Sequence, residues 1–173
     1  NMKNLIKFLA IVVCVLTVTG ASAQTTPKFG HIESNKLMSI MPEMNAAQTS
    51  LQNKAMEFDK QLNEMKAEYQ KLIKAFQDAE KTMSDIVKAT KVKEIQDAEQ
   101  RIGTFNQYAQ QELAKTKEEL LKPIIEKSTN AIKQVGEENG FIYIFDLRAG
   151  NILYFSGKSV DVLPLVKKKL GIQ

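Results

Sequence analysis

The sequence predicts an α+β protein in which a long antiparallel helical hairpin, the arm, projects from a small β-body whose strands are pooled between subunits into a barrel. Two observations lead to this fold class. An apolar repeat typical of coiled coils runs through residues 41–135, where only Gly103 and Pro123 interrupt it after Pro42. The segment that follows, GFIYIFDLRAGNILYFS (residues 140–156), has the β-rich composition of a hairpin, which is marginally stable by itself.

Residues 1–23 are expected to form a secretory signal peptide. Lys3 and Lys7 supply its basic end, residues 8–18 are an apolar stretch shorter than a membrane span, and Ala21-Ser22-Ala23 fits a small-residue cleavage site. We therefore expect cleavage after Ala23 and a periplasmic protein, with a retained membrane anchor as the alternative.

Loss of this leader would change the composition of the chain. Cys14 is the only cysteine, so residues 24–173 hold no disulfide and no thiol ligand. Lys3 and Lys7 are two of 24 basic residues, which leaves 22 basic against 20 acidic side chains and a net charge of about +2. A charge this small gives no reason to expect a nucleic acid partner.

The first helix of the arm is predicted from a repeat of 3.5 residues that begins just before Pro42, a residue suited to a first helical turn. The a positions of the repeat are Met41, Gln48, Ala55, Leu62, Tyr69, Phe76, Met83 and Thr90, and the d positions are Met44, Leu51, Phe58, Met65, Leu72, Ala79 and Ile86. Only Gln48 and Thr90 interrupt this apolar seam, so the repeat strongly indicates a coiled coil.

A second seam, with a stutter, predicts the returning helix. Its apolar residues are Ile95, Ala98, Ile102, Phe105, Ala109, Leu113, Leu120, Ile124, Ala131 and Val135. The two seams have similar lengths, so residues 42–122 are expected to form the arm, with its tip near residues 84–92. About 40 residues per helix would reach roughly 60 Å. Pro123 removes a helical hydrogen bond and is the predicted hinge between arm and body.

Four apolar side chains of the arm fall outside the seams, at Met56, Ile73, Val87 and Tyr108. Two interpretations stay open: an ordinary scatter of exposed apolar residues, or a surface that contacts apolar partners. The methionines of the seams favour the second, because methionine packs adaptably.

Lysines gather toward the predicted tip, at Lys71, Lys74, Lys81, Lys88, Lys91 and Lys93. They form either a solvated helix surface or a patch that steers anionic partners, such as acidic lipid head groups, toward the arm.

The body is expected to comprise residues 24–41, with a strand and a short helix, and residues 123–173, with a helix, the hairpin and a last helix. In the hairpin both strand faces are apolar, so the strands require cover on both sides. An arm that leaves the body cannot supply this cover, whereas pooled strands from several copies can. The predicted oligomer core is Phe29, Ile142, Ile144, Leu153 and Tyr154.

Over nearly the whole of residues 24–173, the chain resembles the Skp/OmpH-like periplasmic chaperones. The resemblance rests on the order and spacing of several short pieces: Pro42 with Ala47-Gln48 and Leu51, Leu121-Lys122-Pro123-Ile124, Ala131-Ile132, Glu138-Asn139-Gly140-Phe141, Phe145-Asp146, Ile152-Leu153-Tyr154, Asp161-Val162, Val166 and Leu170-Gly171. Two departures are Leu163, where relatives usually have threonine, and a net charge closer to neutral than in strongly basic relatives.

The resemblance implies a homotrimer with a β-barrel body and three helical arms around a cavity, which holds unfolded outer-membrane proteins without ATP. A weak contact with anionic lipid or lipopolysaccharide stays open. The alternative function is that of a structural coiled-coil protein of the envelope without chaperone activity.

No motif in the sequence predicts catalysis, a cofactor or a metal. Ser156-Gly157-Lys158-Ser159 resembles the end of a phosphate-binding loop, but Ile152 stands where the first glycine is required. His31, the single histidine, has no second ligand or catalytic partner near it in the sequence. We therefore do not expect an enzyme.

Overall fold

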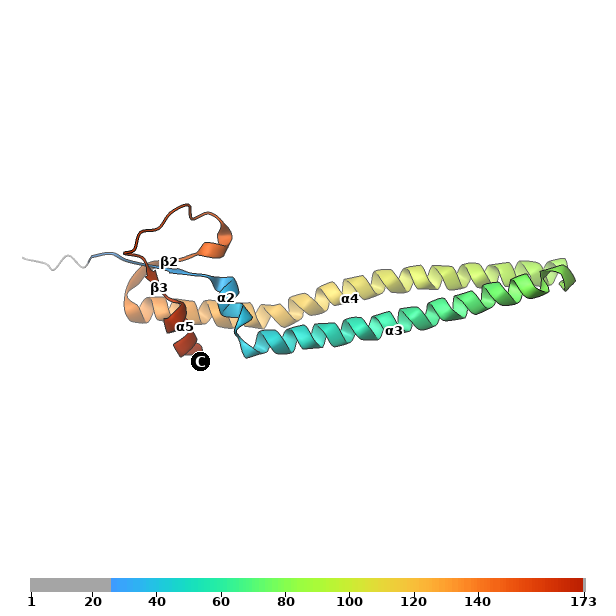
Figure 1. The fold of residues 1–173 in the computed structure, drawn as a ribbon, viewed down its shortest axis with the longest axis horizontal. Coiled ribbons are helices and arrows are strands. Elements are labelled where there is room, and N and C mark those ends of the chain that lie inside the picture. The colour runs from blue at the N-terminus through green and yellow to red at the C-terminus, as the bar shows by residue number, and fades with distance from the viewer. Residues whose placement is uncertain (1–25, 173) are drawn as a thin grey trace, which may run out of the picture.

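The computed structural model describes residues 26–172, so the predicted signal peptide lies outside the described residues. Two long helices lie side by side and project from a small body that holds the strands, two short helices and the C-terminal end (Figure 1). The predicted combination of long helices and a small sheet is confirmed. Between residues 26 and 172, no helix is both long and apolar enough to cross a bilayer.

The arm consists of α3 (Pro42–Ala79) and the longer α4 (Asp85–Asn139), joined through the short 3₁₀ helix η2 (Glu80–Thr82). The predicted tip near residues 84–92 is corrected, because the chain turns at residues 80–84 and residues 85–92 are already helical. These residues contain no glycine or proline, and Asp85 in the first turn of α4 interacts favourably with the helix dipole.

The two seams face each other along the arm. Ala47, Ala98 and Ala109 are buried between the helices, and the rings of Phe58 and Phe105 meet edge to face with their centroids 5.9 Å apart. Ile86 is an exception: it was predicted as a seam residue but is 81% exposed. The repeat of α3 does not continue across the turn: the less exposed positions of α4 include Lys88, Lys91, Ile95 and Ala98, and Ile86 lies outside this set.

The sheet of the body has three parallel strands in the order β2-β1-β3. The central strand is β1 (Lys28–Ile32), and its neighbours are β2 (Phe141–Asp146) and β3 (Val160–Asp161). The predicted hairpin over residues 140–156 is therefore wrong, because β2 pairs with β1 and residues 151–155 form no strand.

The end of β2 shows why the chain leaves the sheet. The carboxylate of Asp146 accepts a hydrogen bond from the N–H of Arg148 at 3.1 Å, and the 3₁₀ helix η3 (Leu147–Ala149) follows directly. The chain then continues as a loop and returns to the free side of β1 as β3 (Figure 1). In the single chain, β1 therefore pairs with β2 on one side and with β3 on the other, and residues 151–155 lie outside the sheet.

A register shift gives the sheet one covered and one exposed face. Lys28 is opposite Phe141, but the next residue of β1, Phe29, is opposite Tyr143. As a result Phe141 and Ile144 both pack against the core, while Tyr143 and Phe145 lie on the other face. The expectation that neither face has intrachain cover is therefore wrong for one of the two faces.

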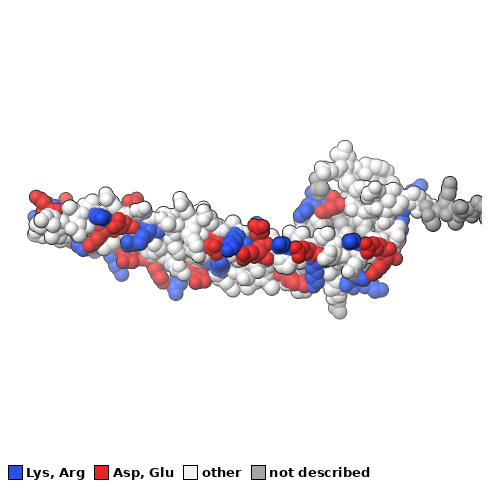
Figure 2. Space-filling model, turned by 180° about the vertical axis from the view of Figure 1, so that it is seen from behind, with Lys and Arg blue, Asp and Glu red and all other residues white. Residues whose placement is uncertain are grey.

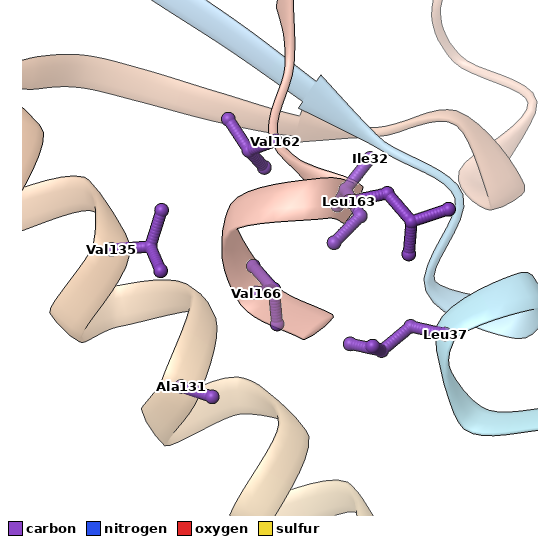
Figure 3. Packing of buried hydrophobic residues seen from close by; sticks show 7 residues of the cluster. All are labelled: Ile32, Leu37, Ala131, Val135, Val162, Leu163 and Val166. Carbon is purple, nitrogen blue, oxygen red and sulfur yellow. The ribbon is translucent and has the colours of Figure 1, made fainter. Parts of the chain in front are cut away.

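The core of the body lies between that covered face, α4 and the two short helices α2 (Ser34–Ser39) and α5 (Leu163–Leu170). Figure 3 shows its buried side chains, which are Ile32, Leu37, Ala131, Val135, Val162, Leu163 and Val166. The N-cap residue of α5 is Val162, which offers no side-chain cap, but the N–H of Leu163 donates to the Asp161 carboxylate at 2.9 Å and so has a partner.

A smaller cluster at the base of the arm connects α3 to α4. Met41 and Ala47 pack there against Ile124. Full burial of a side chain such as isoleucine or methionine stabilises a fold by about 1.5–3 kcal/mol. This cluster therefore fixes the start of α3 next to the point where α4 enters the body.

Hydrogen bonds fix both ends of β2. Gly140 ends α4 in the left-handed conformation (φ 69°), with its N–H directed at the carbonyls of Glu137 and Gly136. At the other end, the Ser34 hydroxyl donates to Asp146 at 2.6 Å. Burial raises the pKa of Asp146, but hydrogen bonds from Ser34 and from the N–H of Arg148 outweigh it, so the pKa lies below its ordinary value.

The two glycines Gly30 and Gly103 provide a matched test of this packing. A Cβ on Gly30 would lie 2.9 Å from Val162 Cγ1, whereas one on Gly103 would meet nothing within 4 Å. We expect Gly30→Ala to lower the free energy of unfolding by about 1–3 kcal/mol. Gly103→Ala should raise it by about 0.5–1 kcal/mol through helix propensity. Urea unfolding at equal protein concentration measures both, and an unchanged Gly30→Ala would contradict the described core.

Candidate functional site

The exposed apolar side chains of the arm are the first candidate surface. Among the four side chains predicted to contact apolar partners, Met56, Val87 and Tyr108 are 54%, 43% and 52% exposed. Ile73, next to the seam residue Leu72, is half-buried. Three of the four positions therefore present apolar surface to solvent.

An aromatic cluster lies in the middle of the arm around Tyr108. Its ring centroid is 6.0 Å from that of Phe58 and 6.4 Å from that of Phe105. The ammonium of Lys54 lies 5.8 Å from the Phe58 ring and donates across the helix pair to Thr116 at 2.7 Å. Phe58 and Phe105 belong to the seam and contact Tyr108 from one side. The other side of the Tyr108 ring remains open to solvent.

The tip presents further apolar side chains that were not predicted as part of this surface. Ile86 and Val92 are exposed beside Val87 in the first turns of α4. The missed signal was that the repeat of α4, read back from Ala98 through Ile95, Lys91 and Lys88, does not include Ile86.

The six lysines of the predicted basic patch lie on this same distal part of the arm, at Lys71, Lys74, Lys81, Lys88, Lys91 and Lys93. Lys91 is paired with Glu94 at 2.7 Å. Figure 2 shows basic and acidic side chains interspersed along this face of the arm, without a continuous field of one sign.

The second candidate surface is the exposed face of the sheet. The ring of Phe29 stacks with that of Tyr143, with their centroids 6.4 Å apart, and the rings of Tyr143 and Phe145 stack with their centroids 5.9 Å apart. Of the predicted oligomer core, Phe29, Ile142, Leu153 and Tyr154 are exposed, and Leu153 reaches 97%. Ile144 instead packs against the core of its own chain. Tyr143 and Phe145 were predicted as strand residues but not as part of this surface, because the register shift between β1 and β2 is not encoded in a local pattern.

A hollow of about 870 Å³ lies between this face and the loop that precedes β3. His31 Nδ1 is 2.9 Å from the Ser159 hydroxyl, and the His31 ring centroid is 4.4 Å from that of Phe155. These contacts connect the loop to the sheet. In Figure 2 the protruding upper part of the body carries few charged side chains, in contrast to the arm.

The predicted hinge lies at the base of the arm, where α4 continues through Pro123 without ending. Pro123 itself is exposed, while its neighbour Ile124 is buried. One turn later, Lys127 forms an ion pair with Glu43 of α3. The hydrogen bond from Lys127 lowers the pKa of Glu43 below its ordinary value. The base of the arm is thus held by both apolar and ionic contacts.

These features define a protein with a small body of strands and short helices and a projecting antiparallel helical arm. Solved structures contain the same fold. A structure of a candidate OmpH-like outer membrane chaperone from Caulobacter crescentus CB15 superimposes with a TM-score of 0.72, at 15% sequence identity and over 88% of each chain. No curated protein sequence matches the chain.

The family of the chain follows from its sequence. The family model described as "Outer membrane protein (OmpH-like)" matches residues 28–170, which include the body and the entire arm. The chain therefore belongs to the OmpH-like family.

Proposed function

We propose that the protein is an ATP-independent holdase chaperone of the periplasm, which binds unfolded outer-membrane β-barrel proteins between its arms. Membership of the OmpH-like family and the likeness to a candidate outer membrane chaperone support this proposal. The observation that carries it is the arm itself. It is a helix pair that extends away from the body and leaves Met56, Val87 and Tyr108 open to solvent.

The chemistry of the arm suits unfolded chains without a fixed shape. Methionine side chains adapt to different neighbours, and tyrosine offers a large apolar ring with a polar end. Each such side chain contributes about 1.5–3 kcal/mol when it is fully buried, before ordering costs. Physiological salt screens surface charges beyond about 8 Å. Acidic side chains among the tip lysines also reduce the local positive charge. Apolar contact is therefore proposed to hold the client, and the lysines only to steer it.

The holding activity is tested by dilution of a urea-unfolded β-barrel protein into buffer with and without the protein. We expect a stoichiometric amount to suppress light scattering from aggregation. A folded protein that gives no suppression would contradict the proposal and favour a structural coiled-coil role.

Two sets of variants then separate apolar from electrostatic binding. Met56→Ser combined with Tyr108→Ser should weaken client affinity by about tenfold or more, since two apolar contacts are lost. The matched set, in which glutamine replaces Lys88, Lys91 and Lys93, should change the affinity less, and moderate salt should have little effect. Fluorescence anisotropy with a labelled client measures both. A larger defect in the lysine set, with a steep loss in salt, would show that charge holds the client.

We further propose that the working form is a homotrimer whose strands combine into one barrel. The exposed face of the sheet supports this, because its stacked rings at Phe29, Tyr143 and Phe145 are 41%, 61% and 41% exposed. The outer edge of β2 has no partner strand in the described chain. The β-rich segment Ile152 to Phe155 is also unpaired, so a neighbouring copy offers a complementary strand.

Adjacent residues of β2 distinguish assembly from folding. Tyr143→Glu places a charge on the exposed face, so the chain should stay folded while its mass by light scattering falls to that of a monomer. Ile144→Asp places a charge in the core of the chain and should unfold the body, at a cost of several kcal/mol. A wild-type protein that is monomeric at micromolar concentration, with native helix content, would rule out the trimer.

The arm is proposed to pivot near Pro123, because an internal proline leaves one carbonyl of α4 without its helical partner. Pro123→Ala should restore this bond and restrict arm motion, while the mass stays the same. Spin labels on the arm and body measure the distribution of distances between them. A distribution as broad as in the wild type would exclude Pro123 as the pivot.

A further inference from the structure

Methionine is the residue type of residues 24–173 that oxidants attack most readily. The sequence has no tryptophan, and its single cysteine, Cys14, lies in the predicted leader. Methionine thioethers are oxidised to sulfoxides, and their exposure to solvent decides which of them react first. The methionines of the described chain are Met38, Met41, Met44, Met56, Met65 and Met83.

Met56 differs from the other methionines in its exposure. It is 54% exposed on the arm, whereas Met41 is fully buried in the cluster with Ala47 and Ile124. The remaining methionines are half-buried, either in the seam between α3 and α4 or beside that cluster. An oxidant that arrives from water therefore reaches Met56 first.

The surroundings of Met56 can accept a polar product. Met56 borders a hollow on α3 whose other residues are Asp59, Lys60, Asn63, Glu64 and Ala67. Lys60 and Glu64 are 4.0 Å apart, and both side chains are largely exposed to water. A sulfoxide oxygen at Met56 would stay hydrated, so the helix pair should remain folded. In a seam methionine the same oxygen would lie between the helices, where an unpaired polar group is costly.

We propose that Met56 is a site of reversible oxidation, and that its sulfoxide form weakens the contact between the arm and an unfolded client. The effect on the client rests on the proposed holdase function. Methionine contributes an adaptable apolar contact, whereas its sulfoxide is polar and chiral. Oxidation would therefore change the client surface without a change in the fold.

The oxidant and the reductant are small molecules of stated class. Hydrogen peroxide transfers one oxygen atom to the sulfur of Met56: an S–O bond forms, the O–O bond breaks, and the other oxygen leaves with both hydrogens as water. The sulfur loses two electrons and the peroxide gains them. In the reverse step two thiols are oxidised to a disulfide, and the sulfoxide oxygen leaves as water, in a reaction that methionine sulfoxide reductases catalyse.

Peptide mapping by mass spectrometry tests the oxidation site. The folded protein is treated with hydrogen peroxide until it carries about one added oxygen per chain, and catalase then removes the peroxide. Met56 should be oxidised at least about tenfold faster than Met41, since susceptibility follows exposure. Equal rates would overturn the site. A loss of helix content by far-UV circular dichroism would show that seam methionines react as well, and would overturn the selectivity.

Fluorescence anisotropy with a labelled client, added after the peroxide is removed, measures the consequence for binding. The dissociation constant of the oxidised wild type should rise at least about threefold, because part of one apolar contact is lost. Met56→Leu lacks the thioether, so its dissociation constant should be the same before and after treatment. The matched variant Met65→Leu keeps Met56 and should still respond. Sulfoxide reductases of both stereospecificities, supplied with a thiol, should return the wild type to its starting affinity.

The outcomes distinguish this inference from the holdase proposal. A rise that Met56→Leu shares, or that the reductases do not reverse, would assign the effect to another residue and overturn the role of Met56. Oxidised Met56 with an unchanged dissociation constant would overturn its effect on the client. Untreated protein that binds no client would overturn the holdase proposal together with that effect, and the peptide map alone would then decide whether Met56 is the oxidation site.

Discussion

The packing of β1, α2 and α5 around the last turns of α4 is the constraint on which the rest of the structure depends. Ala131 and Val135 lie one turn apart on the buried side of α4, and their small size lets α5 approach through Val166 (Figure 3). Because α4 is one continuous helix of 55 residues, fixing this end also determines where the arm leaves the body. The smaller cluster of Met41, Ala47 and Ile124 then places α3 alongside it.

This architecture leaves apolar surface exposed in both parts of the molecule. A pair of helices covers only one side of each partner, so residues just outside the seam, such as Met56 and Tyr108, stay in contact with water. In the body, α4 and α5 cover one face of the sheet and leave Tyr143 and its neighbours on the other. A compact domain of this length would bury most of these side chains. Exposure here is a consequence of how the secondary structure is distributed.

The sequence predicted the features that depend on local periodicity, and it failed where distant segments compete. The seams of α3 and α4 followed from the heptad repeat, and Met56 and Tyr108 were recognised because they fall outside it. The hairpin was wrong because the partner of β2 is β1, about 110 residues away, and no local pattern encodes that choice. The register shift at Phe141 reversed the expected alternation of faces. Ile86 was misplaced because the repeat of α3 was extended across the turn at residues 80–84, where the helix register changes.

The two exposed surfaces depend on each other if the protein acts as proposed. One arm offers only a few apolar contacts, and an unfolded chain loses conformational freedom with each contact that it makes. Several arms held on a common body raise the effective concentration of each for a client already bound to another, so weak contacts add up without a specific pocket. The face around His31 and Tyr143 would then determine how many arms a client meets. On this argument a change in assembly alters client binding even when every residue of the arm is intact.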